Sequence, residues 1–454
     1  MAEQLIISIS GMRGIVGETL TDSVTHNYGC AFGTFLKNSC AGGTKKLSVC
    51  IGRDSRASGP MLKSAIASGL CDTGIDVVDL AIVPTPSVGV MVRQLGCSGG
   101  VVITASHNPI QYNGIKLLLS NSIAPPAEKA EQIKRLFLGG KFSLADSRNR
   151  GKLTSNEQTD AVHVSKVLSI VDKRVIASKK FRVVLDSVNG AGGRITKRLL
   201  NELGCKVVAI NDEPTGLFAH APEPTAENLT GFCETVKNEK AQVGFAQDPD
   251  ADRLAIIDEN GIYIGEEYTL ALAAKYIFSR GAGDAATNLS TSRMLDDIAE
   301  KAGGRVFRTP VGEAYVAAAM LEHNCIIGGE GNGGVIDLRV NPIRDSLVGI
   351  ALVLQLMAET GKSISRLAAE IGGYHMIKTK FAADKAQAKK ILSAAKKLFA
   401  NARLNISDGY RFDFDDGWLH LRASNTEPVV RVIAEATTER AVKEYIDAVL
   451  KIAR

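Results

Sequence analysis

The chain has 454 residues, of which 45% are hydrophobic and 23% charged, and 54 basic against 49 acidic residues give a net charge of +5. This average usage argues against disordered and collagen-like proteins, and roughly 150 residues per domain predicts about three globular domains. The basic residues form no long runs and only 5% of residues are aromatic, so nucleic-acid binding is not expected.

The start of the chain, residues 1–7, has no basic segment ahead of a long apolar stretch, so a signal peptide is not expected. Apolar runs such as 182–185 stay far below the roughly 18 residues that span a bilayer, so no membrane is expected as a partner. Eight cysteines are scattered singly and form no C-x-x-C pair. We therefore expect a cytoplasmic protein with reduced, mostly buried thiols.

The first third of the chain alternates between strands, turns and amphipathic helices, which is typical of α/β domains. The expected elements are a strand at 45–51, a helix at 61–73, strands at 75–80 and 99–104, and a helix at 127–138. The following stretch, 140–158, is rich in Ser, Asn, Lys and Gly and predicts a connection between domains.

The same pattern begins again twice, without a shared sequence period. The expected elements are a strand at 180–186 with a helix up to 203, a strand near 285 with a helix at 294–302, a helix at 383–399, strands at 417–421 and 429–433, and a helix at 438–452. The sequence therefore predicts an α/β fold with four domains, at 1–150, 151–256, 257–368 and 369–454, of which the last is a smaller α+β domain.

The first candidate site is the loop Thr104–Pro109, which contains Ser106 and His107. Because it follows an apolar strand, its side chains are expected at the edge of a sheet where α/β folds bind ligands. Adjacent residues are a poor nucleophile–base pair, and no G-x-S-x-G motif surrounds Ser106, so a serine protease or esterase is disfavoured. A polar turn that ends at Pro109 is the alternative.

The second candidate site follows the apolar strand 243–246 and contains Asp248, Asp250 and Asp252. Three carboxylates at alternate positions can converge on one hard cation, and oxygen ligands suit Mg²⁺. Arg253 stands where a calcium loop of the helix-loop-helix type needs glycine. A solvated acidic turn is less favoured, because the three charges repel one another. Asp252 also departs from the aspartyl-phosphatase motif, which has Thr or Val there.

Two further loops are rich in hydrogen-bonding groups. The segment 422–428 offers Arg422, Ser424, Asn425 and Thr426, a donor set that suits a phosphate group; an Asn-centred hairpin is the alternative. The glycine-rich segment 328–334 lacks the Gly-Lys-Ser/Thr of a P-loop. Its Glu330 and Asn332 suit sugar hydroxyls, and a plain flexible loop is the alternative.

In order and spacing, these four loops resemble the α-D-phosphohexomutase superfamily, which includes phosphoglucomutase, phosphomannomutase and phosphoglucosamine mutase. The segments Ser10–Gly14 and Asn113–Lys116 also resemble motifs of the family. The resemblance extends over nearly the whole chain. It implies three similar α/β/α domains with mixed sheets and a smaller C-terminal α+β domain, arranged around a central cleft.

The resemblance also implies a reaction, that of an intramolecular phosphotransferase of the isomerase class. A phosphorylated Ser106 exchanges its phosphoryl group with a hexose phosphate through a bisphosphate, so that phosphate moves between O6 and O1, and hexose 1,6-bisphosphate acts as activator. One Mg²⁺ per chain is held by Ser106 and the three aspartates. The implied catalytic residues are Ser106, His107, Lys116, Arg13 and Arg253, and the implied substrate-binding residues are Glu330, Asn332, Arg422, Ser424, Asn425 and Thr426. Either Lys116 or His107 transfers the proton.

The subtype depends on smaller features. The glycine-rich segment 328–334, called the sugar loop, contains Asn332 and Gly334. These two residues, and Pro310 upstream of them, resemble the archaeal-type branch. The opening Ser10–Gly14 resembles that of phosphoglucosamine mutases, which favours glucosamine 6-phosphate as the substrate. A phosphomannomutase/phosphoglucomutase of broad specificity and a catalytically silent sugar-phosphate-binding homologue stay open as alternatives. The expected partners are sugar phosphates, and the expected assembly is a monomer or homodimer.

Overall fold

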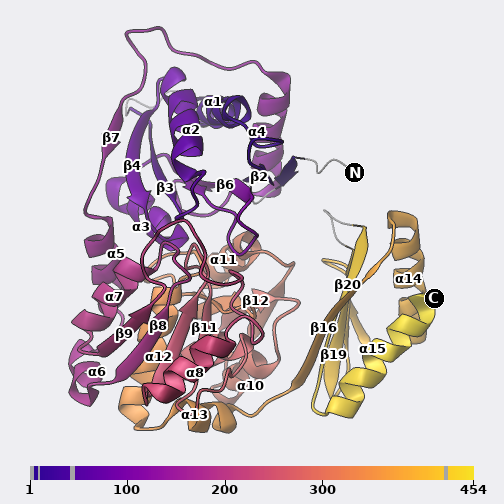
Figure 1. Ribbon diagram of the computed structural model, residues 1–454. Coiled ribbons are helices and arrows are strands. Elements are labelled where there is room, and N and C mark those ends of the chain that lie inside the picture. Colours follow the sequence, from indigo (N-terminus) through magenta and orange to yellow (C-terminus); the bar gives the residue numbers. More distant parts are fainter. Residues whose placement is uncertain (1–4, 9–10, 41–45, 424–427, 454) are drawn as a thin grey trace.

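The computed structural model describes residues 5–8, 11–40, 46–423 and 428–453. These residues form four β-sheets, each associated with helices, and the fourth sheet stands to one side of the other three (Figure 1). This architecture confirms the predicted α/β fold with a smaller C-terminal α+β domain. The exact boundaries between the domains stay a prediction.

The first sheet has the strand order β1-β2-β6-β5-β3-β4-β7. Its strands are β1 (Ile6–Ser8), β2 (Gly11–Ile15), β3 (Ser48–Arg53), β4 (Asp76–Ile82), β5 (Gly99–Ile103), β6 (Tyr112–Leu119) and β7 (Leu153–Ser155). The helices of this region are α1 (Asp22–Ser39), α2 (Gly59–Asp72), α3 (Thr85–Leu95) and α4 (Ala127–Gly139). The connection predicted at 140–158 therefore contains a short strand, β7, which pairs with β4 and extends the first sheet.

The second and third sheets have four strands each, in the orders β11-β10-β8-β9 and β13-β12-β14-β15. The strands are β8 (Arg182–Asp186), β9 (Lys206–Ile210), β10 (Val243–Gln247), β11 (Leu254–Ile257), β12 (Ala285–Asn288), β13 (Val306–Thr309), β14 (Ile327–Glu330) and β15 (Gly334–Ile336). The helices are α5 (Thr159–Leu168), α6 (Lys173–Lys179), α7 (Gly193–Glu202), α8 (Thr230–Asn238), α9 (Glu267–Ser279), α10 (Met294–Lys301), α11 (Glu313–Glu322), α12 (Ser346–Thr360) and α13 (Ile364–Ile371).

The first three sheets share one topology. In each, the first strand of a four-strand unit lies between the second and the third and is parallel to both, and the fourth strand returns antiparallel to the third. The three units begin at β3, β8 and β12. The equivalent connection, from the third strand to the fourth, carries Ser106 in the first unit, the three aspartates in the second and Asn332 in the third.

Apolar residues cover both faces of these sheets, which explains the continuous apolar runs in the sequence. In β3, for example, Val49 and Ile51 pack into one core cluster while Cys50 faces another. The second and third sheets share a core around α12, whose residues 346–358 are all buried. Asp345 caps the start of α12 and Gly361, with a φ of 66°, ends it.

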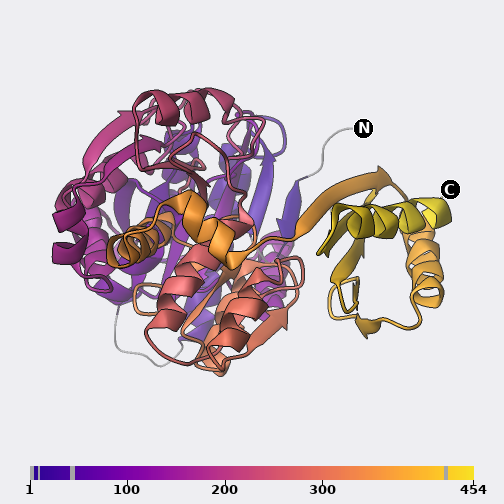
Figure 2. The ribbon, with the colours of Figure 1, turned by 90° about the horizontal axis from the view of Figure 1, so that it is seen from below.

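The C-terminal sheet is antiparallel, in the order β16-β20-β19-β18-β17. Its elements are β16 (His375–Ala382), α14 (Lys385–Leu398), β17 (Arg403–Asn405), β18 (Tyr410–Asp413), β19 (Gly417–Ala423), β20 (Val429–Ala436) and α15 (Glu439–Ala453). Figure 2 shows this domain beside the rest of the molecule. Partly buried polar contacts join it to the third domain: Glu435 accepts from the backbone nitrogen of Arg293 at 2.8 Å, and Nδ1 of His420 lies 2.9 Å from Oγ of Ser290.

Within the described part of the chain, no single helix combines the length and the apolar composition needed to cross a bilayer. The consecutive helices α12 and α13 meet those criteria only together, and they meet at a bend of 93°.

Candidate active site

The candidate site lies where the third-to-fourth-strand connections of the first three sheets approach one another. In the part of the chain that the structure describes, it brings Ser106, Asp248 and Asp252 together with Arg344 and Glu330 through the hydrogen bonds described below. Each connection follows the carboxyl end of a buried parallel strand, the edge at which open α/β sheets bind ligands.

The loop between β5 and β6, called the serine loop, is held in place by Arg56, whose side chain is fully buried. Its guanidinium donates to the backbone carbonyls of Ser106, Asn108, Pro109 and Tyr112 at 2.6–2.9 Å. A further bond of 3.0 Å joins its Nε to Oδ2 of Asp54. The planar guanidinium therefore fixes most of the backbone of this loop.

Ser106 itself has a left-handed backbone conformation, with a φ of 49°. Such a conformation is strained for a residue with a side chain, and strained residues cluster at functional sites. The hydroxyl of Ser106 donates to Oδ2 of Asp248 at 2.8 Å, and Nδ1 of His107 lies 3.3 Å from Oγ of Ser106. The serine side chain thus points directly at the acidic loop of the second domain.

The acidic loop presents three fully buried carboxylates, those of Asp248, Asp250 and Asp252. One oxygen atom from each lies within 4.8 Å of the others, close enough to hold one metal ion. Oδ1 of Asp250 and Oδ1 of Asp252 have no hydrogen-bond partner among the described residues. Buried carboxylate oxygens without partners are costly, and a hard divalent cation would satisfy them, so the donor set fits a metal.

The charges around this loop are strongly coupled. Burial and the neighbouring carboxylates raise the pKa of Asp248 well above its usual range. Burial would also raise the pKa of Asp250, but the ammonium group of Lys116 and the hydroxyl of Thr85, at 2.7 and 2.6 Å from Oδ2, hold that pKa below its usual value. Burial opposes the charged form of Lys116, yet Asp250 and Asp252 raise its pKa, so Lys116 is an ammonium ion here.

A buried arginine, Arg344, connects the acidic loop to the sugar loop. Its guanidinium donates to Oδ2 of Asp252 at 2.6 Å, to Oε2 of Glu330 at 2.8 Å and to Oε2 of Glu313 at 3.0 Å. The other oxygen of Glu330 accepts from Nδ2 of Asn288 at 2.7 Å and from the backbone nitrogen of Gly312. Glu330 therefore organises the loop from within.

Asn332, in the middle of the sugar loop, is half-buried, and its Oδ1 has no hydrogen-bond partner among the residues that the structure describes. It therefore offers an acceptor to a bound hydroxyl group.

Three more predicted residues line the same region. Burial and the cations Arg253 and Arg13 lower the pKa of His107 to about 3, so its imidazole is neutral. Nε2 of His107 and Nη1 of Arg253 face Oε1 of Glu223, at 3.7 and 3.5 Å. Burial lowers the pKa of Arg13, which the negative charge of Asp250 partly offsets. Positive groups thus surround the acidic loop, as the binding of an anionic substrate requires.

The C-terminal domain contributes Arg422, the described residue of the predicted phosphate clamp. Its Nε donates to Oδ1 of Asp408 at 2.9 Å, and Oδ2 of Asp408 accepts from the backbone nitrogen of Val311 at 3.0 Å. Asp408 therefore joins the clamp to the loop of the third domain that begins at the end of β13. Ser424, Asn425 and Thr426 lie outside the described residues, as does Ser10.

The sequence did not reveal several residues of this site. Arg56 and Thr85 follow β3 and β4 at the same sheet edge as Ser106, so their position after strands was an available signal. Glu313, Arg344 and Asp408 have no such local signal.

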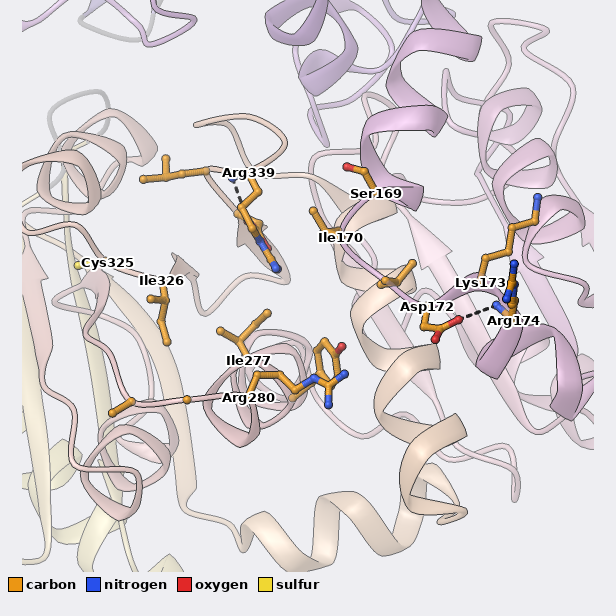
Figure 3. Close-up of a pocket in the computed structure, with 16 residues that line it drawn as sticks. Ser169, Ile170, Asp172, Lys173, Arg174, Ile277, Arg280, Cys325, Ile326 and Arg339 are labelled. Carbon is orange, nitrogen blue, oxygen red and sulfur yellow. Dashed lines mark hydrogen bonds and ion pairs between the residues drawn. The ribbon is translucent and has the colours of Figure 1, made fainter.

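A cavity of about 1060 Å³ lies away from this site, between the α5–α6 turn, the end of α9 and the segment after β15 (Figure 3). None of the predicted site residues lines it. Two arginines in its lining, Arg280 and Arg339, form ion pairs with Glu359 and Asp337, so the charges of these two arginines are already paired.

Four family models match consecutive parts of the chain. They are described as phosphoglucomutase/phosphomannomutase alpha/beta/alpha domains I, II and III, at 5–143, 161–261 and 266–374, and as the C-terminal domain of the same family, at 376–452.

Individual proteins resemble the chain over nearly its full length. A phosphoglucomutase/phosphomannomutase from Thermococcus kodakarensis is 42% identical over 447 residues, 97% of either chain. A probable phosphoglucosamine mutase from the same organism is 36% identical over 442 residues, 96% of this chain and 95% of that one. The crystal structure of a phosphoglucomutase/phosphomannomutase family protein from Burkholderia thailandensis has a TM-score of 0.86 at 28% identity and covers 99% of this chain and 98% of that one.

Proposed function

The chain belongs to the phosphoglucomutase/phosphomannomutase family, whose members are phosphohexomutases, and from that premise we propose that it interconverts hexose 6-phosphate and hexose 1-phosphate through a phosphorylated Ser106. The observation that carries the role of Ser106 is its hydroxyl, held on the buried aspartate triad by a loop that Arg56 fixes. Phosphoryl transfer depends mainly on positioning and charge stabilisation, which such a rigid loop supplies.

The proposed reaction balances without any other reactant. The phosphoryl group leaves Oγ of Ser106 for the free O1 or O6 hydroxyl of a hexose monophosphate, and the proton of that hydroxyl takes its place on Oγ, relayed by Lys116 or His107. In this relay the ammonium of Lys116 would first give a proton to Oγ and then accept one, whereas the neutral imidazole of His107 would accept first. After the resulting bisphosphate has turned over in the cleft, its other phosphoryl group returns to Ser106. Free hexose 1,6-bisphosphate is the expected activator, because it phosphorylates an enzyme that has lost its phosphate.

The metal in this proposal is one Mg²⁺ per chain, held by Asp248, Asp250, Asp252 and the phosphorylated Ser106. When bound, it would neutralise charge on the transferring phosphoryl group. Arg253, Arg13 and Lys116 add positive charge at the same place. The acidic loop alone would repel the substrate, and these cations offset that repulsion.

The other end of the substrate is assigned to the sugar loop and the C-terminal domain. Arg422 with Ser424, Asn425 and Thr426 would hold the phosphate that is not reacting. Oδ1 of Asn332, which has no hydrogen-bond partner in the described part of the chain, supports a contact with a sugar hydroxyl. Glu330 already accepts three hydrogen bonds from the protein, so its proposed part in substrate binding combines one remaining acceptor position with shaping the loop.

Two observations favour different hexoses. The opening segment 10–14 favours glucosamine 6-phosphate, as the sequence analysis predicts. Of the two Thermococcus relatives, however, the one named phosphoglucomutase/phosphomannomutase is more similar to this chain, at 42% against 36% identity. That difference favours glucose and mannose phosphates, so broad specificity for these two esters is the second candidate.

Phosphorus NMR of the purified protein tests both candidates. The protein receives Mg²⁺, a trace of hexose 1,6-bisphosphate and, in parallel, glucosamine 6-phosphate, glucose 1-phosphate or mannose 1-phosphate. Fastest equilibration of the glucosamine ester supports the first candidate, and fastest equilibration of the glucose or mannose ester supports the second. Ser106→Ala is the control and should abolish either activity. If no ester is interconverted, the proposed reaction is wrong and the chain is a silent homologue.

A further inference from the structure

A buried histidine, His163, joins the first three domains behind the acidic loop. It lies on α5 and is fully buried. Its Nδ1 is 2.8 Å from Oγ of Ser87 at the start of α3, and its Nε2 is 2.7 Å from Oδ2 of Asp345, the residue that caps α12. A carboxylate only accepts hydrogen bonds, so Nε2 donates to Asp345.

The three groups have the connectivity of a Ser-His-Asp catalytic triad, but their burial excludes that role. The exposed fraction is 0% for Ser87 and His163 and 1% for Asp345. A nucleophile must reach its substrate, whereas this serine has no accessible surface. The hydrogen-bonded bridge Ser87–His163–Asp345 must therefore act by holding neighbouring residues in place.

Both ends of the bridge are next to residues that bind the acidic loop. Two residues before Ser87, the hydroxyl of Thr85 donates to Oδ2 of Asp250 at 2.6 Å. On either side of Asp345, Arg344 donates to Oδ2 of Asp252 at 2.6 Å and Oγ of Ser346 donates to the carbonyl of Ala251 at 2.7 Å. Together with the intervening peptide bonds, these contacts form a closed ring that runs from the acidic loop through His163 and back.

The ring engages one oxygen of Asp250 and one of Asp252, and leaves the other oxygen of each without a hydrogen bond among the described residues. Nε of the cation Arg253 lies 3.8 Å from Oδ1 of Asp252. Thr85 and Arg344 occupy Oδ2 of Asp250 and Oδ2 of Asp252, while the two Oδ1 atoms have no hydrogen-bond partner within the described ranges. Outer groups of this kind orient metal-binding carboxylates. We propose that His163 is a positioning residue for the metal site. It acts through Ser87 and Asp345 to orient the metal-binding carboxylates of Asp250 and Asp252, and this proposal rests on the proposed function.

The test measures the affinity of the full-length protein for Mn²⁺ alone, by electron paramagnetic resonance. All variants are first incubated with glucose 1,6-bisphosphate and brought to equal phosphorylation, as judged by intact mass. His163→Phe keeps a planar side chain, slightly larger than imidazole, and removes both hydrogen bonds, so it should weaken Mn²⁺ binding about tenfold. His163→Gln keeps a donor for Asp345 and should recover part of that loss.

The chain offers a matched control. Nε2 of His26 lies 2.8 Å from Oδ2 of Asp72, a contact of nearly the same length between α1 and α2 of the first domain. His26→Phe should therefore leave Mn²⁺ affinity within about twofold of the wild type. The kcat of His163→Phe should recover when Mn²⁺ is raised to saturation, whereas a general loss of structure would not be corrected in this way.

A folded His163→Phe variant with the affinity of the control overturns the proposal. If His163→Phe does not fold, Ser87→Ala decides, because it removes only one hydroxyl group: weaker Mn²⁺ binding by about threefold or more supports the proposal, and unchanged binding overturns it. The wild type is assayed alongside for hexose phosphate interconversion. A wild type that binds Mn²⁺ but lacks this activity refutes the proposed reaction and leaves the affinity comparison valid.

Discussion

Arg56 is the residue on which the geometry of the serine loop depends most. It satisfies four backbone carbonyls and one carboxylate from a fully buried position. These contacts need the planar, five-donor guanidinium of arginine, and a lysine ammonium cannot make all five of them at the same time.

Arg56→Lys should therefore lower the free energy of unfolding by about 3 kcal/mol and kcat by about 100-fold, because carbonyls lose their donors and Ser106 shifts. Urea unfolding and steady-state assays measure the two effects. Arg53→Lys is the matched control, since the Arg53 side chain donates to the carbonyl of Asp54 at 3.1 Å and to none of the serine-loop carbonyls. Full activity in Arg56→Lys would show that the loop holds its shape without this residue.

His420 makes the C-terminal domain sensitive to acid. Burial lowers its pKa from 6.5 to about 4, and Nε2 donates to the carbonyl of Asp408 at 2.6 Å. The unfolded chain therefore binds a proton at higher pH than the folded one, so stability is present above about pH 6.5 and falls as the pH drops towards 4. Over that window the loss should reach about 3 kcal/mol.

Trp418, the only tryptophan of the sequence, is buried in the same domain and reports its unfolding by fluorescence. In urea titrations between pH 7 and 4, the stability of His420→Gln should fall less steeply than that of the wild type. His375→Gln, which changes an exposed histidine of the same domain, should keep the wild-type slope. Equal slopes for all three proteins would contradict the role of His420.

The connections between the third and fourth strands are the elements on which the site is built. In the third sheet this connection is glycine-rich because the chain approaches the acidic loop closely: a Cβ on Gly333, which has a φ of +86°, would lie 2.4 Å from the carbonyl of Leu254. The carbonyl of Gly333 also accepts from the backbone nitrogen of Leu254 at 3.0 Å. This contact fixes the position of the sugar loop relative to the end of the acidic loop.

Gly333→Ala should displace the sugar loop and lower kcat/KM by about tenfold or more. Gly361→Ala is a matched control, because Gly361 has a φ of +66° but open space around its Cβ position. Both changes should cost about 1 kcal/mol of backbone strain, and only the first should affect turnover. Equal kcat/KM values for the two variants would show that the close approach does not matter for catalysis.

Sequence patterns predicted the elements whose signal is local. The acidic loop combines three carboxylates with a preceding apolar strand, and the helix predicted at 294–302 corresponds to α10, Met294–Lys301. By contrast, Thr85 and Arg344 bind aspartates that are 165 and 92 residues away in sequence, so only the packing of the domains brings them together. The strand β7 also escaped prediction, because its three exposed residues show no apolar alternation.

On the scale of the whole molecule, the proposed function requires the C-terminal domain to lie where Arg422 can reach the substrate. Arg422 lies on this domain, while Ser106 and the aspartates lie on the first two. The domain touches the third domain through Lys378, whose ammonium faces Glu266 at 2.6 Å and Glu267 at 3.2 Å, and through His420.

We expect the C-terminal domain to close over bound substrate and exclude water that would hydrolyse the phosphoserine. Small-angle scattering should then show a smaller radius of gyration when hexose 1,6-bisphosphate is added to the Mg²⁺ enzyme. Arg422→Met, which cannot hold the distal phosphate, should show little change. Unchanged dimensions of the wild type at saturating ligand would exclude closure.

The strand β7 bears on how the molecule could be divided. Val77 of β4 donates to the carbonyl of Lys152 at 2.8 Å, and β7 continues this pairing along one side of the first sheet. A fragment cut at residue 150 would leave β4 as a bare edge, with unpaired amide and carbonyl groups that invite pairing with a second copy. The three exposed residues of β7 thus cover the edge of β4 and oppose self-association. A fragment designed to fold as the first domain alone must include them.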